Sequence, residues 1–232
     1  MRNVTRHEGL PFKASCIIFK TTQYLQNLHR IKILKNIHWK GDQNATFQLH
    51  IQISSKYKPQ KCIAIYWNKP PDNWLKLNID GAAKGNPGPA GAGGLLRDHF
   101  GRIIFAFQEP LGTCSNVQVE LKAIHRGLQI CKDKNLHKIW IEVDALNVIK
   151  ILENPCQGAW NLQDLLQKTR TLMRSLETKI SHIYREGNQA ADFFANQVCS
   201  TKALTILSPE QIGGKVKGIL RLDNLHLPYI WS

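Results

Sequence analysis

The sequence lacks any apolar run of about eighteen or more residues, so we expect no membrane-spanning helix and no membrane partner. Its first residues also lack the long apolar stretch of a secretory signal peptide. The six cysteines include no Cys-x-x-Cys and no other close pair, which argues against a zinc module. We therefore expect reduced thiols in an intracellular protein, with nucleus or cytoplasm left open.

Acidic residues are scarce in the first part of the chain. Residues 1–69 contain 12 Lys or Arg but only 2 Asp or Glu, out of totals of 31 and 17. The remaining residues contain 19 Lys or Arg and 15 Asp or Glu. About +10 of the net charge of +14 therefore lies in the first 69 residues. A basic arm on a nearly balanced domain suits a polyanionic partner such as nucleic acid. A solvated tail without a specific partner has the same composition.

The chain divides by its patterning into three parts. Residues 1–66 show few turn or cap signals, so we expect a weakly ordered basic extension or linker, of which residues 24–37 could be helical. Residues 67–203 carry regular periodicity and enough apolar residues for a packed domain. Residues 204–232 lose that periodicity and are expected to form a C-terminal tail.

The regular part predicts an α/β fold. Residues 75–80 alternate apolar and polar side chains, as a half-buried strand does, and two more strands joined by a turn at Gly101 follow. A helix is expected over 116–133, with Asn116 as its N-cap, followed by a strand over 138–143. Two helices are expected next, over 145–153 and over 161–177, the second opened by Asn161. The last elements are expected to be a strand over 179–184 and a helix over 188–199 opened by Asn188. This order predicts a mixed five-stranded sheet, its first three strands antiparallel, flanked by helices.

Four acidic residues stand where such a fold could bring them together. Asp80 and Asp144 end predicted strands, and Glu120 and Asp192 lie about one turn into predicted helices. Close ionised carboxylates raise one another's pKa unless a cation lies between them. Hard divalent ions prefer oxygen ligands, and a pair of them can activate water at a phosphodiester. Taken singly, each acid could equally be a surface or helix N-terminal charge.

Four segments in the expected order resemble the signature segments of type 1 ribonuclease H. They are IDGAAKGNPGPAGAGG (79–94), NVQVELKAIHRGL (116–128), IEVDA (141–145) and HIYREGNQAADFFAN (182–196). The stretch WNKPPDNWLKLNIDGAAKGNPG is similar to plant ribonuclease H-like domains of reverse-transcriptase and retroelement origin. The resemblance covers about residues 67–203.

The resemblance implies a role for each acidic residue and for one histidine. Asp80, Glu120, Asp144 and Asp192 match the family's carboxylates that bind two Mg²⁺ or Mn²⁺ ions. His182, ten residues before Asp192, matches a mobile histidine that moves protons or aids product release. These five residues are the predicted catalytic set.

The resemblance also implies the substrate. Gly85 and Asn86 match the loop that contacts ribose 2′-hydroxyls, and Asn116 matches a polar contact to an RNA–DNA hybrid. The implied activity is two-metal endonucleolytic hydrolysis of the RNA strand of a hybrid, leaving 5′-phosphate and 3′-hydroxyl ends. We expect a monomer whose basic arm adds contacts to the nucleic-acid backbone.

Two alternatives remain open. One is a retroelement-derived domain of the same fold that binds nucleic acid without cutting it, and the other is an integrase-like nuclease. The GNPG loop and His182 favour ribonuclease H over an integrase. Ala145, where many relatives carry serine, and the lack of a basic protrusion between residues 154 and 178 are departures from the family.

Overall fold

The computed structural model describes residues 14–30, 63–154, 160–197 and 203–231. The chain divides into two compact units, residues 1–61 and 62–232. In the first unit, helix α2 spans Ala14–Arg30, so it begins earlier than the helix expected over 24–37, and residues 31–37 lie outside the described residues. Among the described helices, none combines the length and the apolar character needed to cross a bilayer.

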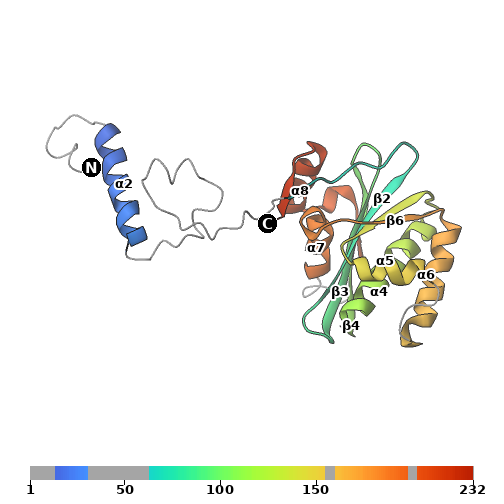
Figure 1. Cartoon of the computed structure of the whole chain (residues 1–232). Coiled ribbons are helices and arrows are strands. Elements are labelled where there is room, and N and C mark those ends of the chain that lie inside the picture. Colours follow the sequence, from blue (N-terminus) through green and yellow to red (C-terminus); the bar gives the residue numbers. More distant parts are fainter. Residues whose placement is uncertain (1–13, 31–62, 155–159, 198–202, 232) are drawn as a thin grey trace. The chain divides into compact units, whose positions relative to one another are not determined.

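A six-stranded mixed sheet forms the centre of the second unit, in the order β6-β5-β2-β3-β4-β7 (Figure 1). Its strands are β2 (Leu75–Ala83), β3 (Gly88–Arg97), β4 (Ile103–Cys114), β5 (Ile139–Val143), β6 (Lys179–His182) and β7 (Thr205–Leu207). The strands β2, β3 and β4 are antiparallel neighbours, and β5 runs parallel to β2 and β6. The predicted mixed α/β architecture is thus confirmed. Strand β7 adds a sixth strand, too short to leave an alternation pattern in the sequence.

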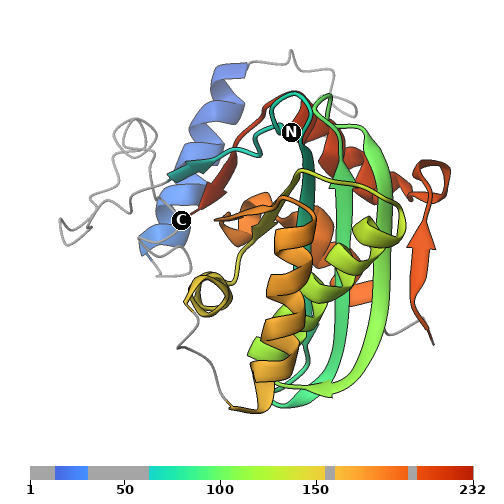
Figure 2. The same cartoon turned by 90° about the vertical axis from the view of Figure 1, so that its right-hand side faces the viewer.

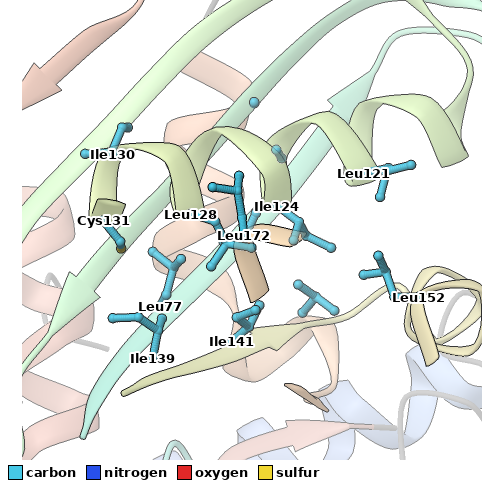
Figure 3. Close-up of a cluster of buried hydrophobic side chains, with 14 of the residues drawn as sticks. Leu77, Leu121, Ile124, Leu128, Ile130, Cys131, Ile139, Ile141, Leu152 and Leu172 are labelled. Atoms are coloured by element: carbon cyan, nitrogen blue, oxygen red, sulfur yellow. The ribbon is translucent and has the colours of Figure 1, made fainter. Parts of the chain in front are cut away.

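Helices cover both faces of this sheet (Figures 1 and 2). One face carries α4 (Asn116–Asp133), α5 (Leu146–Glu153) and α6 (Gln163–Ser175), and the other carries α7 (Gln189–Asn196) and α8 (Gly214–Asn224). Figure 3 shows the main core, in which apolar side chains of α4 point towards those of β2 and β5. Each fully buried leucine or isoleucine there stabilises the fold by about 1.5–3 kcal/mol.

Strand β2 is buried on both faces rather than on one. Leu77 and Ile79 belong to the core under α4. The alternate residues Lys76 and Asn78 are also almost completely buried, because other parts of the chain cover the second face. The expected half-buried strand was therefore wrong in this respect. Its polar side chains are partners in a buried network rather than solvent contacts.

Two helix starts differ from expectation. The N-cap of α4 is Ser115 rather than Asn116: its side chain accepts a hydrogen bond from the Gln118 backbone N–H, and the Gln118 side chain accepts one from the Ser115 N–H. This reciprocal pair satisfies two free donors of the first turn. Helix α6 begins at Gln163 after a 3-10 turn over Trp160–Leu162, so Asn161 does not open it.

The residues after 203 form regular structure in this unit. Strand β8 (Tyr229–Trp231) pairs antiparallel with β1 (Ile63–Ile65), and the side chains of Val216 and Leu220 in α8 are buried against Leu95 of β3. The domain limits proposed from the sequence, 67–203 with a tail over 204–232, leave β1, β7, α8 and β8 outside. Those limits stay a prediction.

Candidate active site

Three of the four predicted metal-binding acids meet at one edge of the sheet. Asp80 lies in β2, Asp144 directly follows the parallel strand β5, and Glu120 lies in the second turn of α4. One carboxylate oxygen from each lies within 4.8 Å of the other two. In the parallel register of β2 and β5, Asn78 lies opposite Glu142, so Asp80 and Asp144, each two residues further on, reach the same edge. Strand β2 continues past Asp80 to Ala83, so the prediction that Asp80 ends this strand was wrong.

Gly81 allows α4 to come close enough to deliver Glu120. A Cβ atom at position 81 would lie 2.7 Å from the backbone nitrogen of Glu120, which is closer than real Cβ contacts come. Any side chain there would push the helix away from β2. The glycine after Asp80 is therefore a steric requirement of the site.

Burial and mutual repulsion change the protonation of this group. Burial, reinforced by the charges of Asp144 and Asp192, raises the pKa of Asp80 to about 7. Burial, with the charges of Asp80 and Asp144, raises the pKa of Glu120 to about 9. Burial likewise raises the pKa of Asp144, an effect that nearby Arg185 opposes. Without a cation, then, the group retains protons at neutral pH.

These residues fit a divalent cation of the Mg²⁺ type. The donor set consists of carboxylate oxygens, which hard cations prefer. One of them, Glu120 Oε2, is buried without a hydrogen-bond partner among the described residues. A buried polar atom without a partner is costly, and a cation would satisfy it. A cation would also offset the burial and the mutual repulsion that raise the three pKa values.

Asp192, the fourth predicted acid, stands slightly apart. It lies in the first turn of α7 and is not one of the three residues that converge within 4.8 Å. Its Oδ1 accepts a hydrogen bond from Arg185 Nη2 at 2.9 Å. It still lies close enough to raise the pKa of Asp80.

His182 ends strand β6, beside the acids. Its Nε2 lies 3.1 Å from the backbone oxygen of Asp144, and its side chain is exposed. If Nε2 carries the proton and donates it to that oxygen, Nδ1 is the nitrogen that can accept another. An exposed imidazole at the rim suits a group that exchanges protons with solvent.

The predicted substrate residues also lie together. Asn86, in the loop between β2 and β3, accepts a hydrogen bond at its Oδ1 from the backbone N–H of Asn116 at 3.1 Å. Both side chains are exposed, and Gly85 directly precedes Asn86 in the loop. The bond joins the loop to the start of α4, four residues before Glu120. A substrate held by this pair would therefore lie near the acids.

Helix α7, which carries Asp192, is fixed to β2 and β3. Asn188 precedes the helix, but its side chain caps nothing: its Nδ2 donates to the backbone oxygen of Ile79 at 2.8 Å. Its Oδ1 accepts from Asn78 at 3.3 Å. Gly93 on β3 lets the helix backbone approach, because a Cβ there would clash with the nitrogen of Ala195.

A buried charge network links these elements to the C-terminal segment. Arg97 of β3 donates to Asn78 Oδ1 at 2.8 Å and to Asp223 of α8 at 2.6 Å. Asn78 in turn donates to Glu142 of β5, which pairs with Lys76 at 2.8 Å. Such pairs are strongly destabilising when one partner is lost. The network therefore makes the position of α7 depend on residues far along the chain.

Sequence reasoning missed three contributors to this site. Arg185 lies inside the REGNQAAD segment, and a basic residue seven positions before a predicted metal ligand was a usable signal. Gly81 directly follows Asp80 in the motif, so a glycine beside a predicted metal ligand was a second usable signal. Asp223 had no local signal, because its partner Arg97 is 126 residues away.

Comparison with known proteins agrees with this geometry. A family model described as reverse transcriptase-like matches residues 78–198. The chain is 34% identical over 162 residues to a protein of Arabidopsis thaliana whose name assigns it provisionally to ribonuclease H; the match covers 69% of this chain and 26% of that relative. It is 30% identical over 144 residues to the ribonuclease H of Bordetella avium, covering 55% of this chain and 92% of that relative.

Solved structures give the same result for the fold. The crystal structure of RNase H1 from the archaeon Halobacterium salinarum superposes with a TM-score of 0.51 and 28% identity, over 54% of this chain and 96% of that one. Asp80, Glu120, Asp144 and Asp192 all lie inside the range of the family model. The chain therefore belongs to the reverse transcriptase-like family, whose fold it shares with ribonuclease H.

Proposed function

We propose that the chain is an endonuclease that hydrolyses the RNA strand of RNA–DNA hybrids with the help of two divalent ions. The observation that carries this proposal is the convergence of Asp80, Glu120 and Asp144 within 4.8 Å in a chain of this family. The ribonuclease H names of its relatives support the same substrate. The chain spans about a quarter of the Arabidopsis relative, so the activity is proposed for this domain alone.

The acids would hold the ions. Bound Mg²⁺ or Mn²⁺ lowers the pKa of water and offsets the charge that develops on phosphodiester oxygens. Asp80, Glu120 and Asp144 provide oxygen ligands from three separate elements. Asp192 would complete the set once it separates from Arg185, and that arginine would then be able to face the substrate phosphates.

His182 would transfer protons, and the loop that contains Asn86 would contact the substrate. His182 would take up or release a proton at Nδ1 while its Nε2 stays near the Asp144 backbone oxygen. Asn86, fixed by the Asn116 backbone N–H, would present its amide to a ribose 2′-hydroxyl. Detecting 2′-hydroxyls on one strand is what lets a protein distinguish RNA from DNA.

A cleavage panel tests the proposal. Labelled RNA–DNA hybrid, duplex RNA, duplex DNA and both single strands are incubated with the full chain and Mg²⁺. We expect cutting of the hybrid alone, and none in the presence of EDTA. Equal cutting of duplex RNA or duplex DNA would contradict the substrate assignment. A folded protein that binds Mg²⁺ and hybrid but cuts nothing would support a domain that only binds nucleic acid.

A further inference from the structure

A cavity of about 690 Å³ lies beside Asp192, between α7 and α8. That size is within the range of small-ligand sites, about 300–1,000 Å³. Asp192 and Phe193 line it from α7, and Lys215 and Ile219 line it from α8. We call this cavity the α7–α8 groove. The family match ends at residue 198, so α8, and with it the second wall, lies beyond the matched range.

The chemistry of the groove is that of a nucleotide site. The half-buried ring of Phe193 offers an aromatic face, and the ammonium of Lys215 lies 5.2 Å from its centre. Three residues with amide side chains, Gln189, Asn196 and Gln197, line the same cavity, and the Asn196 Nδ2 donates to the backbone oxygen of Asp192 at 2.9 Å. Rings stack on bases, amides can both donate to and accept from base edges, and ammonium groups pair with phosphates.

Its position ties the groove to the proposed reaction. Asp192 lines the groove and also lies close enough to the other acids to raise the pKa of Asp80. Asp192 is thus the residue that the acids and the groove share, and we infer that a strand held at the acids leaves them past Asp192. The α4 side of the acids already has the Asn86–Asn116 pair.

We propose that the α7–α8 groove binds an unpaired nucleotide of the RNA strand next to the site of cutting, with its base on Phe193 and its phosphate at Lys215. This inference rests on the proposed function for the identity of the strand. It predicts that hybrids whose RNA strand extends beyond the duplex bind better than blunt ones.

The test measures binding of the full chain in EDTA, so that no cutting interferes. The ligands are a blunt RNA–DNA hybrid and four derivatives with a 5′ or 3′ overhang of RNA or of DNA. Fluorescence anisotropy gives each Kd. We expect one of the RNA overhangs to lower Kd by about fivefold or more, because stacking of a single base has an effect of at least that size.

Matched variants locate the effect. Lys215→Gln and Phe193→Leu should each abolish the gain from the overhang. Lys217→Gln, which removes the same charge from an exposed position of α8 that does not line the groove, should preserve it. Phe100→Leu, at an exposed phenylalanine in the turn between β3 and β4, should preserve it too.

Three results would overturn the groove assignment: no gain from either RNA overhang, an equal gain from DNA overhangs, or equal losses in Lys215→Gln and Lys217→Gln. Cutting of the blunt hybrid by the unmodified chain is measured in parallel with Mg²⁺. If the blunt hybrid is cut while the overhang has no effect, the groove fails and the nuclease stands. If the overhang gain depends on Phe193 and Lys215 but nothing is cut, the nuclease fails and the groove stands.

Discussion

Arg185 Nη2 lies 2.9 Å from Asp192 Oδ1, so a cation already holds the one predicted acid that stands outside the close group of three. The arginine side chain is 74% exposed and can swing away at little cost. Its charge also lowers the pKa of Asp80 and Asp144, against the effect of burial. Without metal, Arg185 thus partly neutralises the acids, and a divalent ion must compete with it.

Replacing Arg185 should therefore strengthen metal binding. We expect Arg185→Gln to lower the Kd for Mg²⁺ by about two- to fivefold, the range for an exposed charge pair. Isothermal titration calorimetry at pH 9 measures this Kd where Asp80 is ionised and protons compete less than at neutral pH. Arg102→Gln is the matched control, because Arg102 is also exposed and pairs with an aspartate at 2.8 Å away from the acids. Weaker Mg²⁺ binding in Arg185→Gln would show that the arginine does not compete with the ion.

Metal binding should release protons at neutral pH. At pH 7, Glu120 with its pKa of about 9 is protonated, and Asp80 with its pKa of about 7 is half protonated. Since ligands bind metal in their ionised form, we expect about one proton or more to leave per site filled. Calorimetry in buffers of different ionisation enthalpy gives the number of protons released per ion bound. The number of released protons should fall as the pH rises from 7 through 9, and a constant value near zero from pH 6 to 9 would contradict the raised pKa values.

Asp80→Asn should stabilise the metal-free protein at high pH. The folded pKa of Asp80 lies above its ordinary value of 3.8, so its contribution to stability is complete below about pH 4 and is lost as the pH rises through about 7. Removing the charge avoids that loss, which is on the order of 4 kcal/mol at pH 8–9.

Thermal unfolding in EDTA measures this difference. Asp80→Asn should melt above the unmodified protein at pH 8, and the gap should close towards pH 4. In excess Mg²⁺ the order should reverse, because the unmodified site gains more from the ion. Asp72→Asn, at an exposed aspartate, is the control and should show neither effect. An Asp80→Asn protein that melts lower in EDTA at pH 8 would contradict the account of the site.

Asp223→Ala should destabilise the fold although Asp223 lies far from the acids. The substitution leaves the completely buried guanidinium of Arg97 without its ion-pair partner, at a cost of about 3–5 kcal/mol. Urea unfolding monitored by circular dichroism gives the change in the free energy of unfolding. Glu210→Gln, at an exposed acid of the same C-terminal segment, should leave the urea midpoint almost unchanged, as a surface substitution does. A small effect at Asp223 would mean that the C-terminal segment contributes little to this unit.

The sequence predicted the elements whose signals are local. The alternation over residues 75–80 located β2, and Gly187-Asn188 located the start of α7. The acids could be grouped because strand ends and helix starts meet at one edge of a sheet. This inference requires only the order of the helices and strands along the chain. The N-cap of α4 was placed one residue late because Ser115 and Asn116 are both good caps, and only the reciprocal bond with Gln118 distinguishes them.

Long-range features could not be predicted in this way. Short strand β7 and the pairing of β1 with β8 depend on partners far away in the sequence. The burial of Lys76 and Asn78 depends on the elements that cover the second face of the sheet, which no pattern within β2 reveals. The same holds for the Arg97–Asp223 pair and for the groove wall that α8 provides.

The most direct test of the central claim is a strand-resolved cleavage assay. One RNA–DNA hybrid is prepared twice, labelled first on the RNA strand and then on the DNA strand, and treated with Mg²⁺ and either the unmodified chain, Asp80→Asn or Asp72→Asn. We predict cutting of the RNA label by the unmodified chain and by Asp72→Asn, no cutting by Asp80→Asn, and an intact DNA label throughout. Full activity in Asp80→Asn, or cutting of the DNA strand, would contradict the assignment of these acids to RNA hydrolysis.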